Sequence, residues 1–364
     1  MTHDPLRVGL VGANPNQSWA KLSHIPSIKV LPSLALVAVA TSNAETARAA
    51  GAAFGVDEYY ASATELAQSA NVEAVSVCVK VPYHRDIVLA ALDAGKHVMC
   101  EWPLARNVEE AEELAARAEQ SGVHAGVNLQ ARMSPAARRA REIIAGGAIG
   151  RPLSANIVST TPAFGPQTPQ AYAYFDDPTS GANLSTITTG HTLDLAISLL
   201  GGISQLDAMS SIKYPLVELT DGLGSLQRTT PDHLAIQVRF ENGCVLSVEV
   251  DGARPAETPF TFQIIGTDGQ LTLRGGSPYG FQGGDLFLEA SVPFDAPKPP
   301  AAPELQGALA NVGELYERFA RDIRGGEKQT PGFGHAVKLH KLIRSLGVAA
   351  ASGVRQTPDD WPTD

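Results

Sequence analysis

The first third of the chain alternates short, mainly apolar runs with segments of helical periodicity, and no other feature restricts the fold as strongly. The runs RVGLVGA, LALVAVAT, VEAVSVCV, HVMCE and HAGVNL predict strands. Strands that are apolar throughout, with helices between them, form parallel sheets covered on both faces. We therefore predict a doubly wound α/β domain over residues 1–128, with ligands at the carboxyl ends of its strands.

Two helix starts carry clear capping signals. Asn107 can cap a helix with Glu110 three residues on, and Gly122 lies just past its end. Ser134 and Pro135 are typical of a cap and a first helical residue. These signals predict one helix in each segment.

The pattern changes after residue 150. The segments HLAIQVRF, CVLSVEV, TFQIIGT and QLTLRG alternate apolar and polar residues, with turns such as ENG and TDG between them, and so predict antiparallel strands. GHTLDLAISLLGG is one amphipathic helix, and two more helices follow the Pro-rich segment APKPPAAPE. Residues 129–364 are therefore predicted to form an α+β domain with an open, mainly antiparallel sheet, whose last helices could pack back on the first domain.

Composition excludes several classes of protein. The chain has 364 residues, 44% of them hydrophobic and 18% charged, as expected of a globular protein with two domains. A net charge of −10 argues against a nucleic-acid surface, and no apolar stretch is long enough to span a membrane. Without a visible signal peptide or a C-x-x-C pair, we expect a cytoplasmic protein with free thiols and no metal site.

The turn after the first strand, in VGLVGANPNQSWA, has the context of a dinucleotide fingerprint. Gly12 would let the backbone approach a pyrophosphate, with Ala13, Asn14 and Trp19 beside it. The second and third glycines of the fingerprint are missing, so a plain glycine turn explains the motif equally well. The next cofactor candidates, Thr41, Ser42 and Asn43, lie further along the chain.

Thr41, Ser42 and Asn43 end the second strand, where an NAD-selective site would place a carboxylate on the ribose 2′-hydroxyl. Without that carboxylate a 2′-phosphate is not repelled. The cofactor is therefore predicted to be NADP or NAD, with a modest preference for NADP.

AGKHVMCEWPLARNVEEAEEL resembles the signature of the glucose–fructose oxidoreductase, inositol dehydrogenase and rhizopine-catabolism family. The segments VPYH, NLQARMSP, GAIGRPLS, GHTLD and FGHAVKLHKLIRS extend the resemblance over nearly the whole chain. It implies a Rossmann domain, hydride transfer between a nicotinamide and a sugar, polyol or sugar derivative, and a homodimer or homotetramer formed through the open sheet.

Two residues depart from the family pattern. Trp102 stands where these enzymes usually carry the lysine that contacts the reacting group, and Ile187 stands where they carry an aspartate. His191, with Asp194 one helical turn on, matches the family helix. SWAKLSHIP, CEWPLA, NLQARMSP and TTGHTLD are closer to the branch that includes the fungal galactose-pathway regulator, a sensor.

Lys80, in VCVKVPYH, follows a predicted strand at the end where a nicotinamide would lie. A lysine in a partly desolvated cleft can exchange a proton near neutral pH, so we predict that it replaces the displaced catalytic lysine. Two alternatives remain open: contact with cofactor ribose or phosphate, and simple exposure to water. His191 could act as acid or base or hold a substrate hydroxyl, and Asp194 could orient the site or cap a neighbouring element.

The remaining predicted site residues fall into two sets. Cofactor contacts are predicted for Val79, His84, Glu101, Trp102 and Asn128. Substrate contacts are predicted for Trp102, Gln130, Tyr172, Tyr174 and His191. Packing is the alternative for both Trp19 and Trp102. An ordered surface excursion or a subunit contact is the alternative for the segment with the two tyrosines.

Two functions follow from these patterns. The first is an NAD(P)-dependent oxidoreductase acting on a sugar-like small molecule. The second is a dinucleotide- and sugar-binding regulator without turnover, which the absence of both usual catalytic residues favours. The substrate, the direction of reaction and the number of subunits are not readable from the sequence.

Overall fold

The computed structural model describes residues 4–16, 18–222, 224–254, 259–277, 280–358 and 360–363. The chain divides into two compact units. The first comprises Met1–Gln130 and Pro299–Val337, and the second comprises Ala131–Lys298 and Lys338–Asp364. The segment 299–337 therefore belongs with the first unit. The division predicted from the sequence counted it in the second domain and allowed for the last helices of that domain to pack back on the first.

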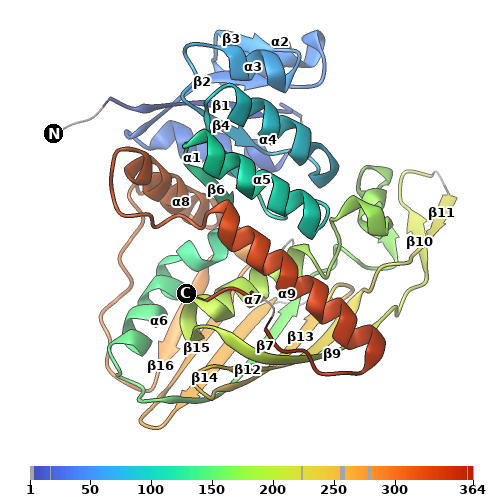
Figure 1. The fold of residues 1–364 in the computed structure, drawn as a ribbon, viewed down its shortest axis with the longest axis vertical. Coiled ribbons are helices and arrows are strands. Elements are labelled where there is room, and N and C mark those ends of the chain that lie inside the picture. Colours follow the sequence, from blue (N-terminus) through green and yellow to red (C-terminus); the bar gives the residue numbers. More distant parts are fainter. Residues whose placement is uncertain are drawn as a thin grey trace. The chain divides into compact units, whose positions relative to one another are not determined.

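The first unit contains a six-stranded sheet in the order β3-β2-β1-β4-β5-β6, and every neighbouring pair is parallel (Figure 1). This is the order of a doubly wound nucleotide-binding fold, as predicted. The strands are β1 Leu6–Val11, β2 Leu34–Ala40, β3 Glu58–Tyr60, β4 Ala74–Val77, β5 His97–Glu101 and β6 Ala125–Asn128.

Helices cover this sheet on both faces. Right-handed crossovers place the helices before and after the strand-order reversal on opposite faces. The helices α3, α4 and α5 pack against one another in sequence, and α1 packs against α8 (Figure 1). The helices are α1 Ile25–Val30, α2 Ala44–Phe54, α3 Ala63–Gln68, α4 His84–Asp93, α5 Val108–Ser121 and α8 Ala308–Ile323.

The predicted capping interactions are confirmed. The Asn107 side chain accepts a hydrogen bond of 2.9 Å from the Glu110 backbone amide. Gly122 ends α5 in the left-handed conformation, with φ of 69°. The Ser134 hydroxyl accepts a hydrogen bond of 3.1 Å from the Ala137 amide at the start of the next helix.

In the first unit, the strand β3 and the helix α3 were not predicted. The edge strand β3 has only three residues, and α3 has six. Segments this short show too few residues for a hydrophobic period to be recognised. The first helical segment also begins with a π-helical turn, Ala20–His24, before α1.

The second unit contains a seven-stranded sheet in the order β16-β15-β14-β7-β13-β12-β9, in which only the β7–β13 pair is parallel. The mainly antiparallel sheet is therefore confirmed. Its strands are β7 Pro152–Thr160, β9 Ile203–Ser211, β12 His233–Phe240, β13 Val245–Asp251, β14 Phe260–Gly266, β15 Gln270–Gly275 and β16 Leu286–Ala290.

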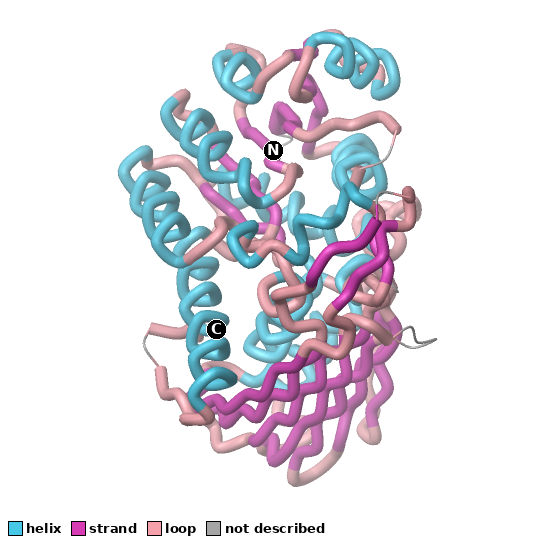
Figure 2. Tube along the Cα trace, turned by 90° about the vertical axis from the view of Figure 1, so that its right-hand side faces the viewer, coloured by secondary structure: helices cyan, strands magenta, loops and turns pink. Residues whose placement is uncertain are grey.

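Helices lie on one side of this sheet (Figure 2). Along β12 the buried residues alternate with exposed ones, so one face forms the core and the other faces outward. The helices are α6 Pro135–Ala145, α7 Ile187–Leu200 and the later part of α9 Phe333–Ser352, which begins in the first unit.

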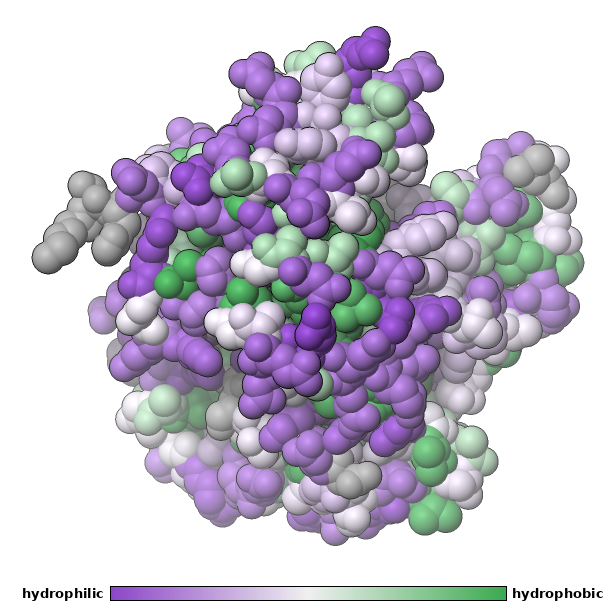
Figure 3. Space-filling view, turned by 45° about the horizontal axis from the view of Figure 1, so that its top comes forward, coloured by the Kyte–Doolittle hydropathy of each residue, from purple (hydrophilic) through white to green (hydrophobic). Residues whose placement is uncertain are grey.

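A small sheet in the order β11-β10-β8 completes the second unit. Apolar side chains gather over β10 and β11 on the face seen in Figure 3. Leu216, the first residue of β10, is 61% exposed. The strands are β8 Gln167–Thr168, β10 Leu216–Leu219 and β11 Gly224–Gln227. Among the described residues, no helix is both long and apolar enough to cross a membrane.

Candidate functional site

The turn after β1 approaches a neighbouring strand closely. Gly12 has φ of +96°, and a Cβ atom there would lie 2.0 Å from the carbonyl oxygen of Cys78. Only glycine fits this position, both for its backbone angle and for its contact. Ala13 is buried and Asn14 is exposed, and the indole nitrogen of Trp19 is buried without a partner among the described residues.

The residues after β2 have local roles. Asn43 caps α2, accepting a 2.9 Å hydrogen bond from the amide of Thr46. The Thr41 hydroxyl lies 2.7 Å from the Thr46 hydroxyl. Ser42 is exposed, and none of these three side chains carries a charge. The end of β2 therefore has no carboxylate to repel a ribose phosphate.

Lys80 lies at the carboxyl end of β4, just before the short 3₁₀ turn Val81–Tyr83. Its side chain is exposed. The predicted proton transfer requires the Lys80 ammonium to be partly shielded from water. A bound ligand would therefore have to provide that shielding. The carbonyl of the preceding residue, Val79, lies 3.0 Å from the Nε2 atom of His84.

The structure gives the His84 ring backbone partners in place of the predicted cofactor contact. Its side chain is fully buried, with Nε2 against the Val79 carbonyl and Nδ1 3.0 Å from the Pro103 carbonyl. Both ring nitrogens face backbone atoms, and burial lowers the pKa of the ring. His84 therefore connects the turn that carries Lys80 to the turn after β5, and does not offer a ring nitrogen to a ligand.

Trp102 is also buried, at 4% exposure, and its peptide bond to Pro103 is cis. A side chain with so little accessible surface has little area to stack on a sugar ring or a nicotinamide. The structure therefore favours packing, the alternative for this residue, over the ligand contacts predicted for it.

Glu101 ends β5, and side chains from four other elements join it in one hydrogen-bond network. Its Oε1 atom lies 2.9 Å from the Nε2 atom of His24 and accepts a hydrogen bond from the amide nitrogen of Asn128. The Nδ1 atom of His24 lies 2.7 Å from the Tyr316 hydroxyl, which lies 2.6 Å from the Ser76 hydroxyl. These five side chains, called here the Glu101 network, fix one carboxylate oxygen.

Three buried polar atoms near the ends of these strands have no partner among the described residues. They are the Oδ1 atom of Asn128, the Oε1 atom of Gln130 and the Nε1 atom of Trp19. Asn128 and Gln130 are each 1% exposed. Buried polar groups are normally hydrogen-bonded, so these atoms fit a ligand that offers both donors and acceptors. A dinucleotide meets that requirement.

In the second unit, Asp194 has a structural partner. Its fully buried carboxylate receives two hydrogen bonds from the Arg132 guanidinium, from Nε at 2.8 Å and from Nη2 at 2.6 Å. With both carboxylate oxygens bound to a guanidinium, Asp194 is suited to holding α7 in place. His191, one turn earlier on α7, is buried at 3% exposure.

The loop with the predicted substrate tyrosines forms an aromatic cluster. Phe175 packs between Tyr172 and Tyr174, with ring centroids 5.6 Å and 4.5 Å away. Burial raises the pKa of Tyr174, so its phenol stays protonated. Arg228 anchors the loop, donating a 2.6 Å hydrogen bond from Nε to Asp176. The cluster is therefore an ordered part of the second unit.

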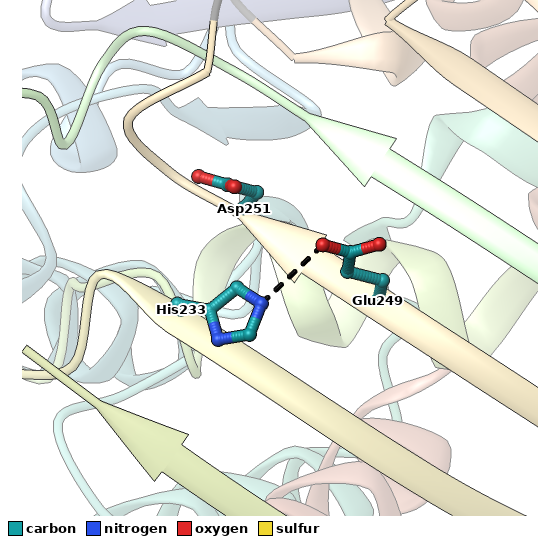
Figure 4. Close-up of side chains that lie close together, drawn as sticks. All are labelled: His233, Glu249 and Asp251. Carbon is teal, nitrogen blue, oxygen red and sulfur yellow. Dashed lines mark hydrogen bonds and ion pairs between the residues drawn. The ribbon is translucent and has the colours of Figure 1, made fainter. Parts of the chain in front are cut away.

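His233, Glu249 and Asp251 lie together at one end of β12 and β13 (Figure 4), with one ligand atom from each within 4.8 Å of the others. Sequence spacing gave no sign of them because they come from two strands. The Nζ atom of Lys213 lies 3.0 Å from Asp251, and Arg254 lies 3.8 Å from Glu249. Lysine and arginine already balance these carboxylates, and we assign the cluster no metal.

The three cysteines are free and buried. Burial raises the pKa of Cys78 and Cys100 well above the ordinary value, and raises that of Cys244 to about 11. Such thiols are poor nucleophiles, which supports a packing role.

Two family models match this chain. One is described as an oxidoreductase family with an NAD-binding Rossmann fold and matches residues 6–129. The other is the Gal80p C-terminal domain and matches residues 135–275. The chain therefore combines a domain of this oxidoreductase family with a second domain similar to the C-terminal domain of Gal80p.

Individual relatives agree with this class. Dehydrogenase aclE of Aspergillus oryzae is 34% identical over 284 residues, 75% of this chain and 77% of that protein. The galactose/lactose metabolism regulatory protein GAL80 of Saccharomyces cerevisiae is 30% identical over 292 residues, 74% of this chain and 67% of that protein. The crystal structure of a super-repressor mutant of Gal80p from the same yeast has a TM-score of 0.85 and 25% identity, covering 97% of this chain and 98% of that one.

The chain therefore belongs to the glucose–fructose oxidoreductase, inositol dehydrogenase and rhizopine-catabolism family. The relatives include a dehydrogenase and a regulator, so membership by itself leaves both predicted functions open.

Proposed function

We propose that this protein is a nicotinamide-dependent oxidoreductase that acts on a sugar, polyol or sugar derivative. The supporting observation is the set of groups at the carboxyl ends of β1, β5 and β6. The Gly12 turn, the fixed carboxylate of Glu101 and the unpartnered amide oxygen of Asn128 all lie at this edge of the sheet. Ligands of doubly wound sheets bind at this edge.

When bound, a nicotinamide would supply or accept the hydride, and the protein would handle the accompanying proton. Lys80, at the end of β4, is the first candidate for that role, and His191 on α7 is the second. Asp194, held by Arg132, would position α7 rather than exchange the proton. Tyr172, Tyr174 and Gln130 remain proposed substrate contacts.

The test is turnover. The protein is incubated with NADP or NAD and a panel of sugars and polyols, and absorbance of the reduced nicotinamide is followed. Turnover with at least one substrate supports the oxidoreductase. Saturable dinucleotide binding without turnover across a broad panel would contradict it and support the regulator.

One observation favours the regulator as a second candidate. Buried Trp102 occupies the position of the usual catalytic lysine, and Lys80 is exposed. If neither Lys80 nor His191 takes part in proton transfer, dinucleotide and sugar binding would serve recognition alone.

We propose NADP as the preferred cofactor, because the exposed end of β2 carries no acidic side chain. Ser42→Asp is expected to raise the Kd for NADPH at least about tenfold and to leave that for NADH nearly unchanged, because the new carboxylate repels the 2′-phosphate. The measurement is a fluorescence titration with each reduced dinucleotide.

Ser42→Asn is the matched control, since it has the same shape without the charge. Its affinities for both dinucleotides should remain near those of the unmodified protein. An equal loss for NADPH and NADH in Ser42→Asp would place the 2′-phosphate elsewhere.

We also propose that the outward face of the seven-stranded sheet mediates a homodimer or homotetramer. Two edge strands carry exposed apolar residues on that face: Met209 on β9 is 75% exposed and Phe287 on β16 is 63% exposed. Sedimentation velocity would measure the assembly, and a monomer at micromolar concentration would contradict it.

A further inference from the structure

The Glu101 network links the dinucleotide edge of the sheet to a helix that comes from the far end of the sequence. His24 follows the first turn, Ser76 lies on β4, and Tyr316 lies on α8. All three are buried, with exposures of 1%, 0% and 2%. Their hydrogen bonds to one another therefore form without competition from bulk water.

The hydrogen-bond directions in this network can be assigned from its chemistry. A carboxylate only accepts hydrogen bonds, so the Nε2 atom of His24 must carry the hydrogen that points to Glu101. In a neutral ring, Nδ1 is then an acceptor, and Tyr316 donates to it. Ser76 in turn donates to the Tyr316 oxygen. Burial raises the pKa of Tyr316 well above its ordinary value, which keeps its hydrogen in place.

The network leaves one half of the carboxylate available. Both hydrogen bonds that Glu101 accepts fall on Oε1, and none from the described residues reaches Oε2. The Glu101 side chain is 16% exposed, and we infer that a ligand approaches it at Oε2, the oxygen that does not bond to His24 or Asn128. A hydroxyl group of a ligand is the simplest donor for it.

We propose that Tyr316 is a positioning residue, which holds His24 in its Nε2–H tautomer and thereby fixes Glu101 as an acceptor for a ligand hydroxyl. The inference about the tautomer concerns the protein alone. The inference about the ligand rests on the proposed function, with the hydroxyl belonging to the bound dinucleotide.

The tautomer is tested without any ligand. Nitrogen-15 NMR of histidine-labelled protein distinguishes protonated from unprotonated ring nitrogens, and His24→Gln identifies the His24 signals among those of the nine histidines. We expect Nε2 to be protonated and Nδ1 to be an unprotonated acceptor. Tyr316→Phe, which removes only the hydroxyl, should shift the Nδ1 signal. A His24 ring with its hydrogen on Nδ1 would overturn the inference, whether or not a dinucleotide binds.

The ligand step is tested by a double-mutant cycle on NADPH affinity. Tyr316→Phe alone is expected to weaken NADPH binding about tenfold, because a less well-positioned Glu101 would lose its hydrogen bond between the charged carboxylate and the ligand hydroxyl. In the Glu101→Gln background the same change should alter affinity less than about twofold, because Tyr316 acts through Glu101.

A purely structural role would give a different result. Equal weakening in both backgrounds would show that Tyr316 stabilises the first unit without positioning Glu101, and would overturn the proposal. If no dinucleotide binds at all, the proposed function fails, and the NMR measurement still decides the tautomer.

Discussion

Lys80→Met is expected to lower kcat by about 10²–10⁴-fold, the usual contribution of a positioned general acid or base. Methionine keeps the unbranched side chain but cannot carry a proton. Because Lys80 is exposed, its loss should leave folding intact. The measurement is steady-state turnover of a substrate found in the sugar panel, together with the Kd for NADPH.

Lys80→Arg separates the three possible roles. Arginine keeps the positive charge but does not release its proton at neutral pH. Loss of kcat in both variants supports proton transfer by Lys80. Weaker NADPH binding in Lys80→Met, restored in Lys80→Arg, indicates contact with ribose or phosphate. Unchanged turnover in both variants would contradict any role and shift attention to His191.

Asp194→Asn is expected to lower the free energy of unfolding by about 3–5 kcal/mol. Asp194 and Arg132 form a buried ion pair, and asparagine places a neutral amide where the carboxylate balanced the buried guanidinium charge. Urea unfolding followed by circular dichroism would measure the loss. The change should be as large at low as at high salt, because the pair is shielded from the solvent.

A double variant is the control for this pair. In Arg132→Met/Asp194→Leu both charges are absent, and stability should recover to within about 1–2 kcal/mol of the unmodified protein. If Asp194→Asn alone unfolds at the same urea concentration as the unmodified protein, the ion pair does not hold α7 in place.

Much of the fold could be predicted because the strands of the first unit can be recognised from their local sequence alone. The apolar runs that became β1, β2, β4, β5 and β6 are uninterrupted, and capping residues such as Asn107 mark the helices between them. The short elements β3 and α3 lack such signals. In the second unit the strands with clear alternation, such as β12, were found, whereas β9, which runs into polar residues at Ser210 and Ser211, was not.

The site was predicted less completely because its residues depend on long-range contacts. Gly12, Glu101 and Asn128 directly follow or end strands, so the parallel sheet alone indicated where they lie. Tyr316 acts on a histidine 292 positions away, and Arg132 on an aspartate 62 positions away. A single sequence contains no signal for such pairings. His84 was predicted near a ligand because the backbone carbonyls that surround it cannot be seen in the sequence.

The first unit is built from two separate parts of the chain, because residues 299–337 belong to it although the second unit begins before them. This arrangement has a consequence for biosynthesis. The chain emerges from the ribosome from its N-terminus, so the β-sheet of the first unit is complete long before α8 and Tyr316 exist. At about 5–20 residues per second, the intervening segment takes roughly ten to thirty seconds to synthesise. During that interval His24 and Ser76 lack their buried partner. The nascent first unit is therefore expected to expose the surface that α8 later covers, and a chain truncated before residue 299 should require a chaperone to remain soluble.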